Sequence, residues 1–323
     1  MKPDTWHGIY PSTVSPLTPD FALDAAALAA HTQAVCAPAG IVGVLCNGHA
    51  GENVYLAREE KRRVVAVTAE SIGATRAIVC GINAENTFDA VAHARDAMAE
   101  GADALMVFAP NGWALLHDPA AIRRHHAAII EATGAPIFLF QASVHAGRTA
   151  YPPDLLAELG QLPGVVGVKE GSWETAAYEA SRRAVQQAAP HVAVMASGDE
   201  HLLSCYVLGS EGSLVSLADI IPETIVALDA AVRAGDLATA RRHHAVIYPL
   251  AKAIYGTAPG GWANARLKAC LHLLGRIPCP ATKPPIGPLP AAEISRLQAA
   301  LRVAGLPVPG PGDAPTIVPG ARC

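Results

Sequence analysis

Charged and aromatic side chains are scarce in this sequence of 323 residues. Asp, Glu, Lys and Arg make up 16% of it, Phe, Trp and Tyr make up 5%, and the formal net charge is −4. A near-neutral chain offers no basic surface for nucleic acid and no charge attraction to an anionic membrane, so neither is an expected partner. No apolar run is long enough to span a bilayer, and residues 1–6 lack the apolar core of a secretion signal, so we expect a cytoplasmic location.

The cysteines do not predict a metal site or a disulfide framework. There are seven, an odd number, and no Cys-x-x-Cys pair occurs. Reduced thiols packed as small apolar side chains are therefore expected. The doublets His125-His126 and His243-His244 fall in expected helices, where adjacent residues do not share a face, so they do not predict a metal site either.

Short apolar runs, by contrast, are plentiful and alternate with alanine-rich helical stretches. Hydrophobic residues make up 51% of the chain. The runs lack clear polar–apolar alternation, as is typical of parallel strands covered on both faces. Helices are expected at 58–71, 87–100 and 119–133, with Thr87 and Asp118 as N-caps of the last two. Strands are expected at 8–15, 40–45, 76–80, 104–108, 137–140, 165–168, 192–196 and 212–216.

Eight such units predict the α/β class, as a (β/α)8 TIM barrel over residues 1–235. Residues 236–306 predict a C-terminal helical extension, with helices at 237–255, 263–274 and 291–304. The remainder, 307–323, is rich in Pro and Gly and is expected to be disordered. A doubly wound open sheet is the alternative, but no Gly-x-Gly-x-x-Gly follows the first expected strand.

A lysine ends the apolar run Gly164-Val165-Val166-Gly167-Val168. In a (β/α)8 barrel the active site lies at the carboxyl ends of the strands, and Lys169 is the only lysine directly beyond an expected strand. A partly desolvated lysine loses its proton readily, and its neutral amine can form a Schiff base with a carbonyl. A structural salt bridge at the strand end, for example with Glu170, is the alternative interpretation.

Several motifs repeat a known pattern in order and spacing. They are Gly8-Ile9-Tyr10-Pro11-Ser12-Thr13-Val14-Ser15-Pro16, Gly48-His49-Ala50-Gly51-Glu52, Gly167-Val168-Lys169-Glu170, Ser197-Gly198-Asp199-Glu200 and Leu208-Gly209-Ser210-Glu211-Gly212. From about residue 8 to residue 306 the chain resembles the dihydrodipicolinate synthase / N-acetylneuraminate lyase family of class I, Schiff-base aldolases.

The resemblance implies roles for individual residues. Lys169 would form an imine with pyruvate or another 2-oxo acid, without a metal or organic cofactor. The loop with Gly48, Ala50 and Gly51 would bind the substrate carboxylate, partly through backbone N–H groups. Ser216 would lie beside the imine. The resemblance also implies a homotetramer built as a dimer of dimers.

The chain departs from the family at positions that transfer protons. Phe140 occupies the catalytic position where the family usually has a tyrosine at the end of the fifth strand. His49 and Ala50 replace the hydroxyl side chains of the carboxylate loop, and the paired tyrosines of the synthases after the fourth strand are absent. We therefore argue against dihydrodipicolinate synthase itself.

Other groups must replace the missing tyrosine if the chain is catalytic. His49 and His145 are the candidates for proton transfer because histidine titrates near neutral pH, and Gln141 could orient a water or a substrate carbonyl. Each could instead be a hydrogen-bonded structural residue. Arg148 loosely matches an arginine that binds a distal carboxylate in the synthases. Two tryptophans, Trp113 and Trp173, could line a pocket for a bulky substrate or simply pack.

The expected function is a Schiff-base lyase or aldolase that forms or cleaves a C–C bond of a 2-oxo acid through Lys169. A dehydratase or hydratase-aldolase that uses the same imine is the first alternative. A non-catalytic barrel that binds an oxo acid is the second, because Phe140 has no hydroxyl.

Overall fold

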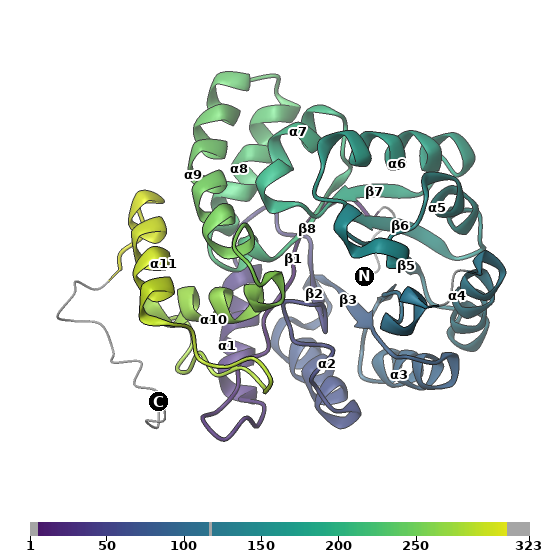
Figure 1. The fold of residues 1–323 in the computed structure, drawn as a ribbon, viewed down its shortest axis with the longest axis horizontal. Coiled ribbons are helices and arrows are strands. Elements are labelled where there is room, and N and C mark those ends of the chain that lie inside the picture. The colour runs from purple at the N-terminus through teal and green to yellow at the C-terminus, as the bar shows by residue number, and fades with distance from the viewer. Residues whose placement is uncertain (1–5, 116–117, 309–323) are drawn as a thin grey trace.

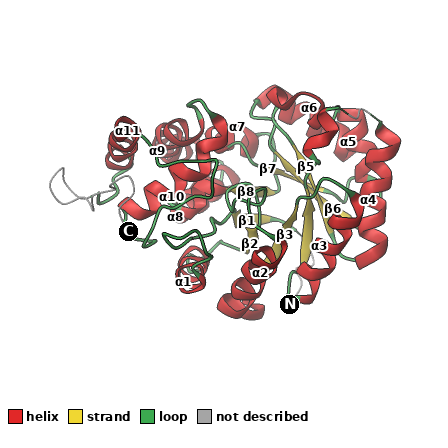
Figure 2. Ribbon diagram, turned by 60° about the horizontal axis from the view of Figure 1, so that its bottom comes forward, coloured by secondary structure: helices red, strands yellow, loops and turns green. Residues whose placement is uncertain are grey.

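The structure, a computed structural model, describes residues 6–115 and 118–308. Eight parallel strands form one sheet in the order β1-β8-β7-β6-β5-β4-β3-β2, and bridges from Ile9 to Ile41 and from Ser12 to Leu45 close it. Figure 2 shows the helices surrounding the strands. The predicted (β/α)8 barrel is confirmed, and the open-sheet alternative is wrong. The strands are β1 (Gly8–Pro11), β2 (Gly43–Cys46), β3 (Ala77–Ile82), β4 (Ala104–Val107), β5 (Ile137–Gln141), β6 (Val165–Glu170), β7 (Ala193–Ala196) and β8 (Gly212–Val215).

The helices follow the strands in regular alternation. Asp118 caps α4 as predicted, by accepting a hydrogen bond from the Ala120 amide. The predicted cap Thr87 is the first residue of α3 instead, because Asn86 has the extended backbone of a cap and accepts from the Asp89 amide. The α-helices are α1 (Ala25–Cys36), α2 (Arg58–Ile72), α3 (Thr87–Ala99), α4 (Pro119–Thr133), α5 (Pro153–Gly160), α6 (Thr175–Ala188), α7 (Leu202–Val207), α8 (Pro222–Arg233), α9 (Leu237–Tyr255), α10 (Ala263–Leu273) and α11 (Ala291–Val303). The 3₁₀ turns are η1 (Gly73–Thr75), η2 (Asn111–Ala114), η3 (Val144–Thr149), η4 (Asp199–His201), η5 (Ser216–Asp219) and η6 (Gly260–Trp262).

Large apolar side chains fill the barrel interior. Tyr10, Met106 and Phe138 belong to one fully buried cluster inside the strands, since alternate residues of a barrel strand point inward. A Cβ atom on Gly167 would lie 2.3 Å from Cε1 of Phe138. The glycine in the run before Lys169 therefore makes room for the Phe138 ring.

The C-terminal helices lie together on one side of the barrel (Figure 1). Helices α9, α10 and α11 fall close to the predicted positions. The predicted tail, 307–323, lies outside the described residues from position 309 onward. None of the helices that the structure describes combines the length and apolar character needed to cross a membrane.

The cysteines only partly follow the expectation of reduced thiols. Cys279 is disulfide-bonded, which contradicts it. The others that the structure describes as free are all buried, and they are Cys36, Cys46, Cys80, Cys205 and Cys270.

Candidate active site

A cavity of about 340 Å³ occupies the mouth of the barrel, at the carboxyl ends of the strands. It is bordered both by strand ends and by the C-terminal extension. Six of the residues singled out in the sequence line it, namely Lys169, His49, Ala50, Phe140, Trp173 and Ser216. The structure therefore brings these six together, as a barrel with its site at this end requires.

Lys169 is a buried amine, with only 7% of its surface exposed. It pairs in register with Phe140 on β5 and Met195 on β7, so its side chain shares the inward-facing layer of the barrel. Its Nζ donates a hydrogen bond to Oγ of Ser12 over 3.1 Å. The Glu170 carboxylate accepts hydrogen bonds from the amide and hydroxyl of Ser172. Lys169 and Glu170 therefore do not form the structural salt bridge that was the alternative interpretation of this lysine.

Burial lowers the pKa of Lys169 to about 8, and the Asp199 and Asp219 carboxylates partly oppose this shift. An ordinary lysine keeps its proton to about pH 10.4. A pKa near 8 gives a useful fraction of neutral amine at neutral pH, and neutral amine is the nucleophile in imine formation.

We expect the rate of imine formation at low pyruvate to rise about tenfold per pH unit up to pH 8 and then to level off, because the neutral fraction follows the lysine titration. Initial rates of imine formation between pH 6 and 10 measure this. A rate that keeps rising to pH 10 would show that the amine is not perturbed.

Two buried carboxylates lie near Lys169. Burial raises the pKa of Asp199 to about 7, and its Oδ1 accepts a hydrogen bond from the Leu217 amide over 2.8 Å. Asp219 accepts from the Val14 amide over 3.0 Å, and burial raises its pKa as well. A carboxyl group that titrates near pH 7 can both donate and accept a proton.

Tyr255 reaches the cavity from the end of α9. Burial and the Asp199 carboxylate hold the pKa of its hydroxyl well above the ordinary value, so it stays protonated. Its ring lies 5.1 Å from that of Trp173, centroid to centroid. Sequence reasoning assigned no role to Ser12, Asp199, Asp219 or Tyr255. Asp199 does follow an expected strand, so its position in the sequence could have indicated it. No local sequence pattern indicates Tyr255, because its position at the cavity depends on how the extension packs over the mouth of the barrel.

The 48–52 loop has the form of an anion cradle. The Glu52 and Asn53 amides donate to the carbonyls of His49 and Gly48 within the loop. The amides of His49 and Ala50 have no acceptor among the described residues, and both residues line the cavity. A Cβ atom on Gly51 would lie 3.1 Å from the Thr13 carbonyl oxygen, a tight contact that glycine avoids. Free backbone N–H groups of this kind bind carboxylates.

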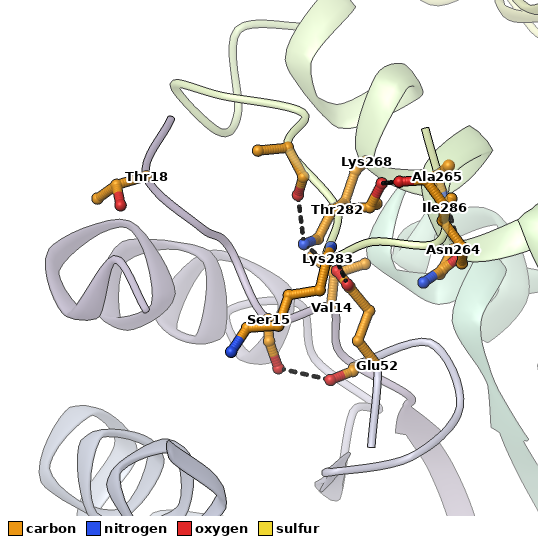
Figure 3. Close-up of polar contacts among 12 residues, drawn as sticks. Val14, Ser15, Thr18, Glu52, Asn264, Ala265, Lys268, Thr282, Lys283 and Ile286 are labelled. Carbon is orange, nitrogen blue, oxygen red and sulfur yellow. Dashed lines mark hydrogen bonds and ion pairs between the residues drawn. The ribbon is translucent and has the colours of Figure 1, made fainter. Parts of the chain in front are cut away.

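A buried ion pair attaches this loop to the C-terminal extension (Figure 3). The Nζ of Lys268 on α10 contacts Oε1 of Glu52, and both side chains are 0% exposed. Lys268 also donates to the Ala281 carbonyl over 2.8 Å, and the Lys283 amide donates to Oε2 of Glu52 over 2.9 Å. Glu52 has a left-handed backbone, with φ of 60°. The extension therefore fixes the last residue of the cradle.

The ring of His49 is packed between two phenylalanines and the cavity. Its centroid lies 4.5 Å from that of Phe108 and 5.2 Å from that of Phe140, while the residue as a whole is exposed. The surrounding protein, together with the Lys169 ammonium, lowers the pKa of His49 to about 4. The imidazole is therefore neutral and weakly basic at neutral pH.

Two other candidates lie away from the cavity. The amide of Gln141 is held by the backbone of Tyr151, with its Nε2 donating over 2.8 Å and its Oε1 accepting over 3.0 Å. His145 is exposed on η3, as is Arg148. Of the two tryptophans, Trp113 is buried against His125, His126 and Tyr151, whereas Trp173 lines the cavity.

Residues 5–304 match the Dihydrodipicolinate synthetase family. A 4-hydroxy-tetrahydrodipicolinate synthase of Anaeromyxobacter sp. is 30% identical over 301 residues, which cover 91% of this chain and 97% of the relative. A probable mitochondrial 4-hydroxy-2-oxoglutarate aldolase of Emericella nidulans is 28% identical over 245 residues, which cover 74% and 78%. The crystal structure of YagE, a prophage protein of the dihydrodipicolinic acid synthase family from E. coli K12 in complex with pyruvate, has a TM-score of 0.86 at 23% identity, covering 94% and 99%. The chain therefore belongs to the dihydrodipicolinate synthetase family of lyases and aldolases.

Proposed function

We propose that this protein is a Schiff-base lyase that acts on pyruvate or another 2-oxo acid through Lys169. The observation that carries the proposal is a buried amine with a pKa of about 8 at the end of β6, in the cavity that also contains the backbone cradle of His49 and Ala50. The amine supplies the nucleophile, and the cradle supplies the site for the carboxylate.

The proposed reaction begins with the substrate carboxylate in the cradle. The neutral Lys169 amine attacks the C2 carbonyl, and loss of water gives a protonated imine. This imine accepts the electron pair of the C3–C4 bond as the 4-hydroxyl loses its proton, which releases an aldehyde and leaves an enamine. Protonation at C3 and hydrolysis then give pyruvate and free lysine. The reverse sequence forms the C–C bond, and elimination of a hydroxyl from the same imine is the dehydratase alternative.

We assign the proton transfers to Asp199 rather than to His49. The pKa of Asp199, about 7, suits transfer in both directions at neutral pH, whereas that of His49, about 4, makes a weak base. Asp199→Asn keeps an oxygen for the Leu217 amide and should lower kcat by about 10²-fold, with the pyruvate imine still forming. Because Asp199 raises the pKa of Lys169, the pH midpoint of imine formation should also fall. Unchanged kcat would exclude Asp199 as the proton carrier.

Exchange of the pyruvate methyl protons in D₂O tests the proposed chemistry without any second substrate. An enamine at Lys169 takes up deuterium at C3, so the methyl signal in the NMR spectrum should disappear with the wild-type protein and persist with Lys169→Arg. Pyruvate that binds without any exchange would instead favour the non-catalytic barrel, which the loss of a hydroxyl at Phe140 motivates.

The synthase reaction itself is not part of the proposal, because Phe140 replaces the tyrosine expected in synthases and Asn111-Gly112 replaces their paired tyrosines. The cytoplasmic location and the homotetramer are also proposals, the second by resemblance alone. Light scattering that shows only monomers in solution would contradict the tetramer.

A further inference from the structure

A second cavity, of about 320 Å³, adjoins the one that contains Lys169. The two share four lining residues, His49, Phe140, Gly171 and Trp173. The second cavity extends from this shared wall toward the ends of β4 and β5 and toward η3. A substrate whose carbonyl carbon is bound at Lys169 could therefore extend into it.

The wall of the second cavity next to Lys169 is aromatic. Phe108 and Phe140 have centroids 4.6 Å apart, and His49 packs against both. The remaining lining is small or uncharged, with alanines at 109, 142 and 146 and the polar side chains of Asn111, Ser143 and Thr149. None of the described residues that line it is Asp, Glu, Lys or Arg.

This lining excludes one class of substrate and favours another. A carboxylate placed there would lose hydration without gaining a cationic partner, which is costly. Arg148, which loosely matches the arginine that binds a distal carboxylate in the synthases, does not line the cavity and is exposed. A flat apolar group would instead stack against the phenylalanine rings.

The register of the strands places this wall beside the reacting carbon. Phe140 is the β5 partner of Lys169, and side chains of register partners on neighbouring strands lie side by side. When the cradle holds the C1 carboxylate of the substrate and C2 is bonded to Lys169, the part of the substrate beyond C3 lies next to the aromatic wall.

We propose that the second cavity binds the uncharged aromatic or other flat apolar substituent of the aldehyde partner. This inference rests on the proposed function and gives its substrate class. C3 of the pyruvate enamine attacks the aldehyde carbon, the aldehyde oxygen takes up a proton, and water hydrolyses the imine. The product is a 4-hydroxy-2-oxo acid with the apolar group on C4, and the lysine is regenerated.

Two aromatic aldehydes, one without and one with a carboxylate on the ring, test the inference. The full-length protein with saturating pyruvate should condense benzaldehyde with a kcat/KM at least tenfold higher than that for 4-carboxybenzaldehyde. Equal values, or a preference for the charged aldehyde, would overturn the inference. Methyl exchange from pyruvate in D₂O does not use the second cavity. Exchange without the preference for benzaldehyde would therefore overturn this inference alone. Absence of exchange would overturn the proposed function and this inference with it.

A matched pair of arginine substitutions on η3 gives a second test. Ala146→Arg places a cation in the lining of the cavity and should shift the kcat/KM ratio toward 4-carboxybenzaldehyde by at least fivefold. Val144 is exposed on the same turn but does not line the cavity, so Val144→Arg should leave the ratio as in the wild type. Equal effects of the two variants would contradict the proposed location of the aldehyde substituent.

Discussion

Replacing Lys169 by methionine is expected to lower turnover by about 10⁴-fold or more, because none of the other described residues that line the cavity is a lysine that could form the proposed imine. The fold should survive. A pKa lowered from 10.5 to about 8 means that burial of the charged amine opposes folding, by about 3 kcal/mol when each pKa unit is worth about 1.4 kcal/mol. That penalty is fully present below pH 8 and disappears as the pH rises toward 10.5. At pH 7 the variant should therefore unfold at no lower urea concentration than the wild type.

Lys61→Met is the matched control for this prediction. Lys61 is also partly buried with a lowered pKa, but it lies on α2, bonded to the Asn83 carbonyl, and lines neither cavity of the mouth. Turnover by the control should stay within about twofold of the wild type. Substantial turnover by a folded Lys169→Met protein would contradict the assigned role.

Lys268→Met is expected to destabilise the protein by about 3–5 kcal/mol, because it leaves the Glu52 carboxylate buried without its cation. Both side chains are fully buried, so solvent cannot compensate. The same change should weaken pyruvate binding by loosening the carboxylate loop. Urea unfolding measures the first effect, and the pyruvate concentration for half-maximal imine formation measures the second.

Lys283→Met provides the comparison. Its ammonium pairs with Glu60, and both side chains are partly exposed, at 18% and 23%. The free energy of unfolding should therefore fall by only about 0–1 kcal/mol. The double variant Glu52→Gln, Lys268→Met should recover part of the stability, since it no longer contains the unpaired charge. Equal losses for Lys268→Met and Lys283→Met would mean that the buried pair does not hold the loop.

The fold was predictable because each unit of the barrel has a local signal. Short apolar runs buried on both faces, separated by helices, indicated eight strands, and Lys169 was evident as the only lysine at a strand end. The ends of strands and helices were harder to predict from the sequence where tertiary contacts determine them. The first strand was expected over 8–15 but ends at Pro11. Beyond it Ser12 keeps only an isolated bridge to Leu45, and its hydroxyl accepts a hydrogen bond from Lys169.

The site was predictable only where its residues end a strand or come soon after one. Phe140 lies near the end of β5 and His49 comes soon after β2, and both line the cavity. His145 also follows a strand, but the 3₁₀ turn η3 carries it to the surface. Tyr255 and Lys268 come from the extension, and their positions depend on packing between segments distant in sequence, which no local pattern reports.

Borohydride reduction in the presence of pyruvate, followed by peptide mapping, tests the central claim most directly. Reduction of the imine would fix the pyruvate carbons to the amine, and the proposed function places the added mass on Lys169 alone among the lysines. Prior exposure to pyruvate should also be required for the modification. An adduct on another lysine, or no adduct although pyruvate binds, would contradict a Schiff-base mechanism at Lys169.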